Sequence, residues 1–138
     1  MIRWVSLLGV AALLAAGCAK HAEQTKQTPP PAAPQHAEFL APRGGEVLVE
    51  GQSFTIRWQA PGWDSVNVAA VMGGKDRGHL VFGRDARADT LVWQVPLGWV
   101  TGFGIARSDS VRLRLEDVGD PNRFVDSAPF TVRGADHP

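Results

Sequence analysis

The sequence predicts an all-β domain, an antiparallel β-sandwich of about seven short strands between residues 38 and 133. Two observations lead to this prediction. Apolar and polar residues alternate with a period of two in several segments, as they do in strands that bury only one face. Clusters of glycine, proline, asparagine and aspartate separate these segments, and no segment of the domain combines a helical apolar repeat with capping residues.

The alternation places the strands along the chain. It is clearest in five segments: Phe54–Trp58, Val66–Ala70, Leu91–Val95, Val111–Leu115 and Phe130–Val132. Turns are expected at residues 42–45, 61–62, 73–74 and 119–122. The single cysteine cannot close a disulfide within the chain, so packing must hold the fold. Trp58 and Trp93 are the candidates for the centre of the core, since each can bury about 200 Å².

Short motifs along the domain carry a resemblance to a known family. They are Pro42 to Glu46 (P-x-x-G-E), Phe54 to Trp58 (F-T-I-R-W), Trp93 to Pro96 (W-Q-V-P) and Ala128 to Val132 (A-P-F-T-V). Together they resemble the immunoglobulin-like domain of the Ser/Thr-rich GPI-anchored fungal cell-wall family, which also occurs in bacterial envelope and secreted proteins. The fungal members are implicated in the assembly of wall β-glucan, without established catalytic residues. The resemblance therefore implies an immunoglobulin-like fold and a location outside the cytoplasm, but no reaction.

The N-terminal residues 1–17 have the features of a secretory signal peptide. Arg3 precedes about a dozen apolar residues, fewer than the ~20 that a permanent membrane-spanning helix needs. The segment Leu14-Ala15-Ala16-Gly17-Cys18 resembles the signal box of bacterial lipoproteins. In that family the peptide is cut before the cysteine, whose sulfur receives a diacylglyceryl group. Cys18 is thus the expected lipidation site, the alternative being a buried structural cysteine behind an ordinary signal.

Residues 18–37 are expected to form a disordered tether between the lipid anchor and the domain. They hold a proline-rich centre and no aliphatic residue larger than alanine, so they cannot bury enough apolar area to offset the entropy of ordering. The prolines favour an extended polyproline II spacer. Residues 134–138 form a short tail. Ala19, which follows the cysteine, resembles the outer-membrane sorting pattern of Gram-negative lipoproteins, so an outer-membrane location is expected if the source is such a bacterium.

The composition argues against several classes of function. The formal net charge is zero, which gives no reason to expect a nucleic-acid partner. His79 is the only histidine in the domain, so a zinc site is not expected, and neither is another metal or cofactor. The glycine-rich segment 73–79 lacks the spacing of a phosphate-binding loop and is expected to form a hairpin between two strands. No Ser-His-Asp arrangement is recognisable, so no catalytic residue is assigned.

Two features are candidates for contact with a partner. Arg112 and Arg114 are expected on the outward face of one strand, in a row that continues across the sheet to Arg133, where guanidinium groups bind carboxylates, phosphates or sugar hydroxyls. The alternative is an ordinary solvated face. The second candidate is an apolar, glycine-rich loop at residues 97–109, which holds Trp99 and Phe103. It either caps one end of the sandwich or forms an exposed patch, and Trp63 joins it if both loops lie at the same end.

The sequence therefore predicts a lipid-anchored envelope protein that displays a non-enzymatic binding or assembly module. Its expected partners are the membrane, through the lipid, and an envelope polysaccharide or protein. One alternative is a glycan hydrolase whose carboxylates come from a set of five: Asp85, Asp89, Glu116, Asp117 and Asp120. The other alternative is a structural subunit of an envelope complex.

Overall fold

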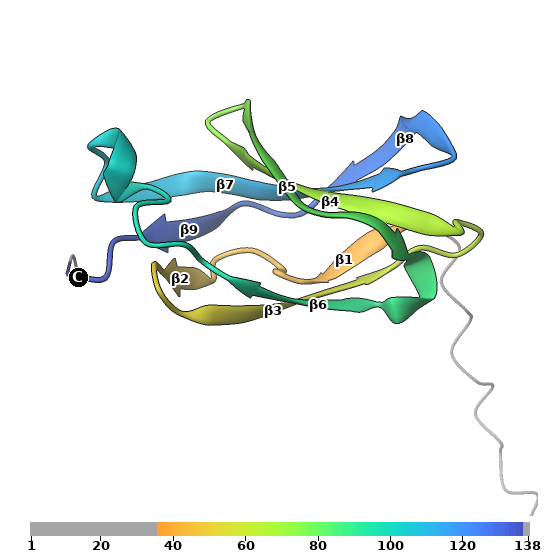
Figure 1. Cartoon of the computed structure of the whole chain (residues 1–138), viewed down its shortest axis with the longest axis horizontal. Coiled ribbons are helices and arrows are strands. Elements are labelled where there is room, and N and C mark those ends of the chain that lie inside the picture. Colours follow the sequence, from red (N-terminus) through yellow and green to blue (C-terminus); the bar gives the residue numbers. More distant parts are fainter. Residues whose placement is uncertain (1–35, 137–138) are drawn as a thin grey trace, which may run out of the picture. The chain divides into compact units, whose positions relative to one another are not determined.

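The computed structural model describes residues 36–136 of the chain, and these residues form two facing sheets (Figure 1). The predicted all-β sandwich is confirmed. The predicted signal peptide, Cys18 and nearly all of the tether lie outside the described residues. None of the helices within residues 36–136 has the length and apolar character that crossing a membrane requires.

Residues 36–136 contain nine strands, two more than the sequence predicted. They are β1 (Glu38–Ala41), β2 (Val47–Val49), β3 (Ser53–Gln59), β4 (Ser65–Met72), β5 (Lys75–Asp85), β6 (Thr90–Gln94), β7 (Arg107–Asp117), β8 (Asp120–Asp126) and β9 (Phe130–Arg133). Two short 3-10 helices, η1 (Ala86–Ala88) and η2 (Thr101–Phe103), precede β6 and β7. The turn predicted at 119–122 is shorter in the structure, because β7 ends at Asp117 and β8 already begins at Asp120.

The smaller sheet has the strand order β1-β3-β6, and the larger sheet has the order β2-β9-β7-β4-β5. In the larger sheet, β7 pairs with β4 along one edge, and β8 and β9 share its other edge. All pairs are antiparallel except β2 with β9, which is parallel and departs from the purely antiparallel sandwich predicted. Along the chain, β2 follows β1 of the smaller sheet, and no hairpin connects it to β9. No tight turn therefore forces β2 and β9 to run in opposite directions.

The core lies between the two sheets. Trp58 is fully buried and Trp93 is 6% exposed, as predicted for the two central tryptophans. The indole Nε1 of Trp58 donates a hydrogen bond of 3.1 Å to the backbone carbonyl of Ala86, which satisfies the one polar atom of this side chain. The largest fully buried aliphatic side chains come from both sheets and from the loop before β7: Ile56, Val66, Val68, Val95, Val100, Val111, Leu113, Leu115 and Val132.

The tip of the β4–β5 hairpin rises above the larger sheet, while β4 stays paired with β7 up to Met72. Its turn consists of Gly73 and Gly74, which have φ angles of 59° and 76°, values that two-residue hairpin turns require and that glycine adopts without strain. The β4–β5 pairing shifts register at three places, and such bulges bend and twist a strand. In Figure 1 the tip of this hairpin and the β7–β8 hairpin both rise above the larger sheet.

Ser127 divides what would be one continuous strand into β8 and β9. It lies between the two strands and is 3% exposed. Its backbone N–H donates to the carbonyl of Leu113, and its hydroxyl accepts a 2.9 Å hydrogen bond from the N–H of the same residue. The hydroxyl also donates to the carbonyl of Ala128 at 2.9 Å. The serine side chain therefore replaces a missing main-chain partner, so that the strand bends without leaving a buried N–H unpaired.

Candidate binding groove on the outer face of the larger sheet

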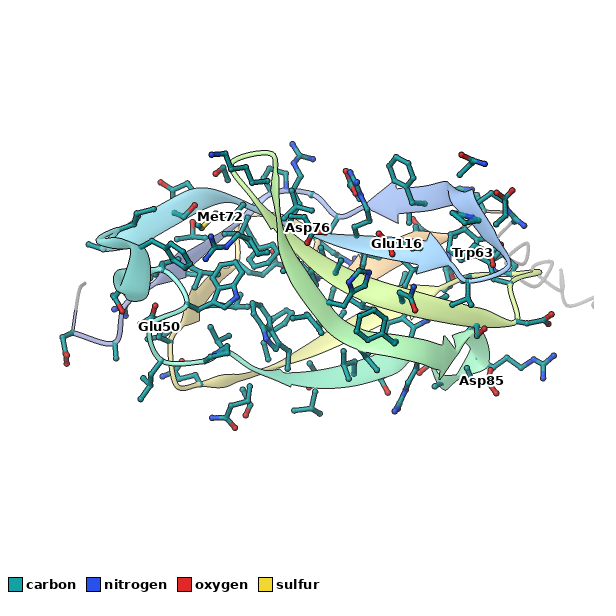
Figure 2. All side chains as sticks on the ribbon, turned by 45° about the horizontal axis from the view of Figure 1, so that its top comes forward. Glu50, Trp63, Met72, Asp76, Asp85 and Glu116 are labelled. Carbon is teal, nitrogen blue, oxygen red and sulfur yellow. The ribbon has the colours of Figure 1, made fainter. Side chains whose placement is uncertain are left out.

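A groove of about 460 Å³ lies on the outer face of the larger sheet, between the two raised hairpins. Its size is in the range of small-ligand sites, roughly 300–1,000 Å³. Strands β4, β5, β7 and β8 and the β4–β5 turn contribute its lining: Ala69, Val71, Gly73, Gly74, Asp76, Ser110, Arg112, Arg114, Glu116 and Asp126. Figure 2 shows Asp76 and Glu116 on this side of the sheet, at the strand β5 that crosses over it.

The register of the strands explains how these side chains meet. On β7, Val111, Leu113 and Leu115 point into the core, so the alternate residues Arg112, Arg114 and Glu116 face outward. Val71 of β4 lies opposite Arg112 on one side and opposite Asp76 of β5 on the other. Ala69 lies opposite Arg114. Small residues thus form the floor of the groove, and charged side chains form its walls.

Arg114, one of the predicted binding residues, is engaged within the protein. Its Nε and Nη2 donate hydrogen bonds of 2.7 and 2.9 Å to the two carboxylate oxygens of Asp126, and its guanidinium lies 4.2 Å from the ring centre of Phe124. The hydrogen bond to Asp126 raises the pKa of Arg114, against a smaller opposing effect of burial, and the nearby carboxylates add to the increase. Because its guanidinium group is already paired with the carboxylate of Asp126, Arg114 mainly forms part of the groove wall.

Arg112, the other predicted arginine, is exposed and much less engaged. In the described part of the chain its guanidinium has one hydrogen bond, a 3.3 Å contact from Nη1 to the carbonyl of Ser127. Most of its five N–H donors therefore have no protein acceptor among the described residues, and the side chain lines the groove. Arg133 does not extend this row, because it lies opposite Arg107 at the other end of β7 and is not part of the groove lining.

The acidic wall of the groove is formed by Asp76, Glu116 and Asp126, which the sequence did not predict to lie together. The Asp76 carboxylate accepts a 2.6 Å hydrogen bond from the N–H of Gly78, and Glu116 contacts the ring of His79 at 3.0 Å. His79 in turn stacks on Phe82, with 4.3 Å between ring centres. Alternation along β7 indicated that Glu116 faces outward. The sequence carried no signal for Asp76 or Asp126, because their position depends on the order of β5, β4, β7 and β8 in the sheet.

The carboxylates considered for hydrolysis are spread over three places. Asp85 and Asp89 flank η1, and Asp117 and Asp120 lie at the β7–β8 turn, while Glu116 lies in the groove. Asp117 is buried and pairs with Arg123 at 3.1 Å, on the opposite side of β7 from Glu116. Residues 36–136 contain no group of three or more histidine, cysteine, aspartate or glutamate side chains arranged to hold a metal ion.

The loop after β6 is held by a buried carboxylate that the sequence did not single out. Glu50 is 4% exposed and follows β2. Its oxygens accept hydrogen bonds from the backbone N–H groups of Gly98 (3.1 Å), Val100 (2.6 Å) and Thr101 (2.9 Å), and from the Thr101 hydroxyl (2.8 Å). Burial acts to raise the pKa of Glu50, but these hydrogen bonds outweigh it and lower the pKa to about 2.

The loop was predicted either to cap one end of the sandwich or to form an exposed patch, and in the structure it does both in different parts. Val100 is fully buried, and Trp99 packs edge-on against Trp93 with 5.5 Å between ring centres, so this part caps the core. Phe103 remains 58% exposed, with the guanidinium of Arg77 3.5 Å from its ring centre. The loop therefore presents apolar side chains on both sides of its buried centre, Leu97 before it and Phe103 after it.

Trp63 does not join this loop. It is 6% exposed and lines a separate hollow with His36 and Arg123, at the end of the sandwich where the described chain begins. Figure 2 shows Trp63 and Glu50, which holds the loop, at opposite ends of the molecule. The structure thus brings Arg112 and Arg114 together and Trp99 and Phe103 together, and places Trp63 apart from both pairs.

Comparisons with known proteins give one similarity. No protein-family model matches the sequence, and no curated protein matches it. Among solved structures, the chain is similar to the fibronectin(III)-like modules of Clostridium thermocellum CbhA, with a TM-score of 0.40 and 13% sequence identity, over 71% of this chain and 93% of that one.

Proposed function

We propose that the protein is a lipid-anchored binding module outside the cytoplasm, whose ligand occupies the groove on the larger sheet. The proposal for the anchor rests on the signal-like residues 1–17, the lipobox-like segment before Cys18 and the proline-rich tether. Acyl chains on this cysteine would hold the domain at a membrane, since each buried methylene contributes about 0.8 kcal/mol. In a Gram-negative source, Ala19 favours the outer membrane. The resemblance to the fungal wall family makes an envelope polysaccharide or protein the proposed ligand.

One observation carries the binding proposal. Arg112 presents a guanidinium with several free donors at the edge of a groove that has a small-residue floor and charged walls. A guanidinium in this state is suited to carboxylates, phosphates or vicinal hydroxyls, which it binds through two parallel hydrogen bonds. The other charged groups of the groove are fixed by partners within the protein, so a ligand meets a prearranged surface and little side-chain entropy is lost on binding.

A glycan hydrolase is less well supported by the geometry. A glycosidase needs two carboxyl groups across a cleft, about 5–9.5 Å apart. Glu116 and Asp117 are neighbours on one strand, and their side chains project to opposite sides of the sheet. The Asp126 carboxylate already accepts hydrogen bonds from Nε and Nη2 of Arg114. A free pair of carboxyl groups, one acid and one base, is therefore not offered by these residues.

A structural subunit is the second candidate function. It is favoured by the exposed apolar side chains of the Glu50-anchored loop, since Leu97 is 76% exposed and Phe103 is 58% exposed. Apolar side chains held on a fixed loop suit a permanent protein contact. The binding module remains the leading proposal because the groove offers directed hydrogen-bond donors, which the loop does not.

The test uses the full chain in detergent and a panel of purified envelope polysaccharides and peptides of known composition. Arg112→Ala is compared with the matched control Arg57→Ala, an exposed arginine on the outer face of the smaller sheet. We expect at least one ligand class to bind wild type and the Arg57 variant equally, and the Arg112 variant about tenfold more weakly or worse. Binding that is insensitive to Arg112 contradicts the groove as the site. Glycan turnover that Glu116→Gln abolishes supports the hydrolase instead.

A further inference from the structure

We propose that the ligand of this groove is an extended peptide segment that carries an acidic and a basic side chain two positions apart. The inference rests on the proposed function and specifies it further, because it chooses between the polysaccharide and the protein ligand. Its basis is the distribution of charge in the groove, the spacing of the side chains on β7 and the nature of the floor.

The groove has two electrostatically different parts. At one part Arg112 carries a positive charge with no carboxylate within ion-pair distance in the described structure. At the other part, Arg114 pairs with Asp126, and Glu116, two residues further along the same face of β7, adds a second carboxylate. This second part therefore has an excess of negative charge. A ligand with only one sign of charge would match one part and be repelled by the other.

The two parts are spaced as alternate residues of a strand. Arg112 and Arg114 are two residues apart on β7, and such positions are separated by about 6.7 Å. Alternate side chains of any extended peptide have the same separation. A peptide laid along β7 therefore places an acidic side chain over Arg112 and a basic side chain over the carboxylates around Arg114. The raised β4–β5 and β7–β8 hairpins would bound it on its two sides.

The floor favours a peptide over a neutral sugar chain. Sugar rings commonly pack their C–H faces on exposed aromatic rings, whose faces are electron-rich. The groove lining contains no aromatic residue among those described, and its floor is formed by Ala69 and Val71. Small aliphatic side chains allow the backbone of a peptide to approach closely. At one end of the groove the Ser110 hydroxyl accepts a 3.2 Å hydrogen bond from the N–H of Gly73 and keeps its own O–H as a donor for a ligand.

The experiment measures fluorescence anisotropy of labelled peptides with the full chain in detergent. The probe is Thr-Val-Glu-Thr-Lys-Val-Thr, and its matched control carries glutamine in place of both charged residues. We expect the charged peptide to bind wild type and Arg57→Ala equally, and the glutamine peptide to bind about tenfold more weakly or not at all. Arg112→Ala and Glu116→Gln should each weaken binding of the charged peptide by about tenfold, and added salt should weaken it further. Equal melting temperatures exclude misfolding of the variants.

The outcomes separate this inference from the function on which it rests. If a neutral β-glucan oligosaccharide binds in an Arg112-dependent manner and the charged peptide does not, the peptide inference is wrong and the binding module stands. If the charged and glutamine peptides bind equally well, the charge argument is wrong. If the charged peptide binds wild type and Arg112→Ala with the same affinity, both the inference and the groove as the binding site are wrong.

Discussion

The carboxylate of Glu50 accepts a 2.6 Å hydrogen bond from the backbone N–H of Val100, fifty positions further along the chain. Val100 is fully buried, and the same carboxylate also binds Gly98 and Thr101. One ionised side chain thus satisfies several backbone donors of an irregular segment, which would otherwise lose hydrogen bonds on burial. Glu50 therefore links the end of β2 to the loop that closes this end of the sandwich.

Replacing Glu50 by glutamine should destabilise the domain by about 2 kcal/mol or more. Glutamine keeps the size of the side chain, but it loses the charge and presents an amide N–H₂ group to backbone donors. The free energy of unfolding, measured by urea denaturation at neutral pH, checks this expectation. Asp64→Asn, which changes an exposed carboxylate, is the control and should leave stability nearly unchanged.

The effect of Glu50 should depend on pH in a defined direction. Folding lowers its pKa from an ordinary value of 4.5 to about 2. A depressed pKa means that the stabilisation is fully present above pH 4.5 and is lost as the pH falls towards 2. The stability difference between wild type and Glu50→Gln should therefore shrink over this interval. A constant difference from pH 6 to pH 2.5 would show that the charge of Glu50 is not what stabilises the loop.

Trp58 should be the most sensitive position of the core. It is fully buried, and its indole nitrogen donates to the carbonyl of Ala86. Trp58→Ala should cost about 3–5 kcal/mol, which is enough to unfold much of a domain of this size. Trp58→Phe keeps most of the apolar volume and loses the hydrogen bond, so a smaller cost is expected. Thermal melting followed by circular dichroism compares the two, and equal costs would contradict the expectation that the buried volume of the ring supplies most of the stabilisation.

Ser127→Ala tests the interruption between β8 and β9. The variant leaves the buried N–H of Leu113 without its hydroxyl acceptor, so a loss of about 1–3 kcal/mol is expected. Amide hydrogen exchange should show faster exchange at Leu113 than at Val111, which lies on the same strand. Ser127→Thr retains the hydroxyl and should restore protection at Leu113. If Ser127→Ala leaves exchange at Leu113 unchanged, the hydroxyl does not replace the main-chain partner.

Trp99 and Phe103 should respond differently to truncation. Trp99 packs against Trp93, so Trp99→Ala should lower stability by about 2–3 kcal/mol. Phe103 is 58% exposed, and Phe103→Ala should change stability by less than about 1 kcal/mol. Differential scanning calorimetry measures both. A large loss for Phe103→Ala would mean that its contact with Arg77 supports the loop.

Lipidation of Cys18 is tested by Cys18→Ala expressed with the complete N-terminal segment. Wild type should partition into detergent and carry acyl groups on an N-terminal cysteine in intact-mass spectra, because the lipobox-like segment directs cutting before that residue. The alanine variant has no thiol to alkylate, so it should lose both the acyl mass and the detergent partitioning. Wild type that is uncut and unmodified would contradict the proposed anchor.

The alternation of residue types determined much of the fold. It predicted the inward and outward faces of β3 and β7, the burial of Trp58 and Trp93, and the outward positions of Arg112 and Arg114. These are local properties, because a strand turns successive side chains to opposite faces whatever its neighbours are. The weakly alternating segments that form β1, β2, β5 and β8 gave no comparable signal, and the structure was needed to define them.

Only the tertiary structure decided which groups meet. Asp126 lies beside Arg114 because β8 pairs with β7, Asp76 reaches the groove because β5 pairs with β4 on the side away from β7, and Glu50 reaches Val100 across fifty positions. Strand pairing and long-range hydrogen bonds depend on the arrangement of all the segments together, and no local pattern encodes them. For the same reason the parallel pairing of β2 with β9 and the separation of Trp63 from Trp99 emerged only from the folded domain.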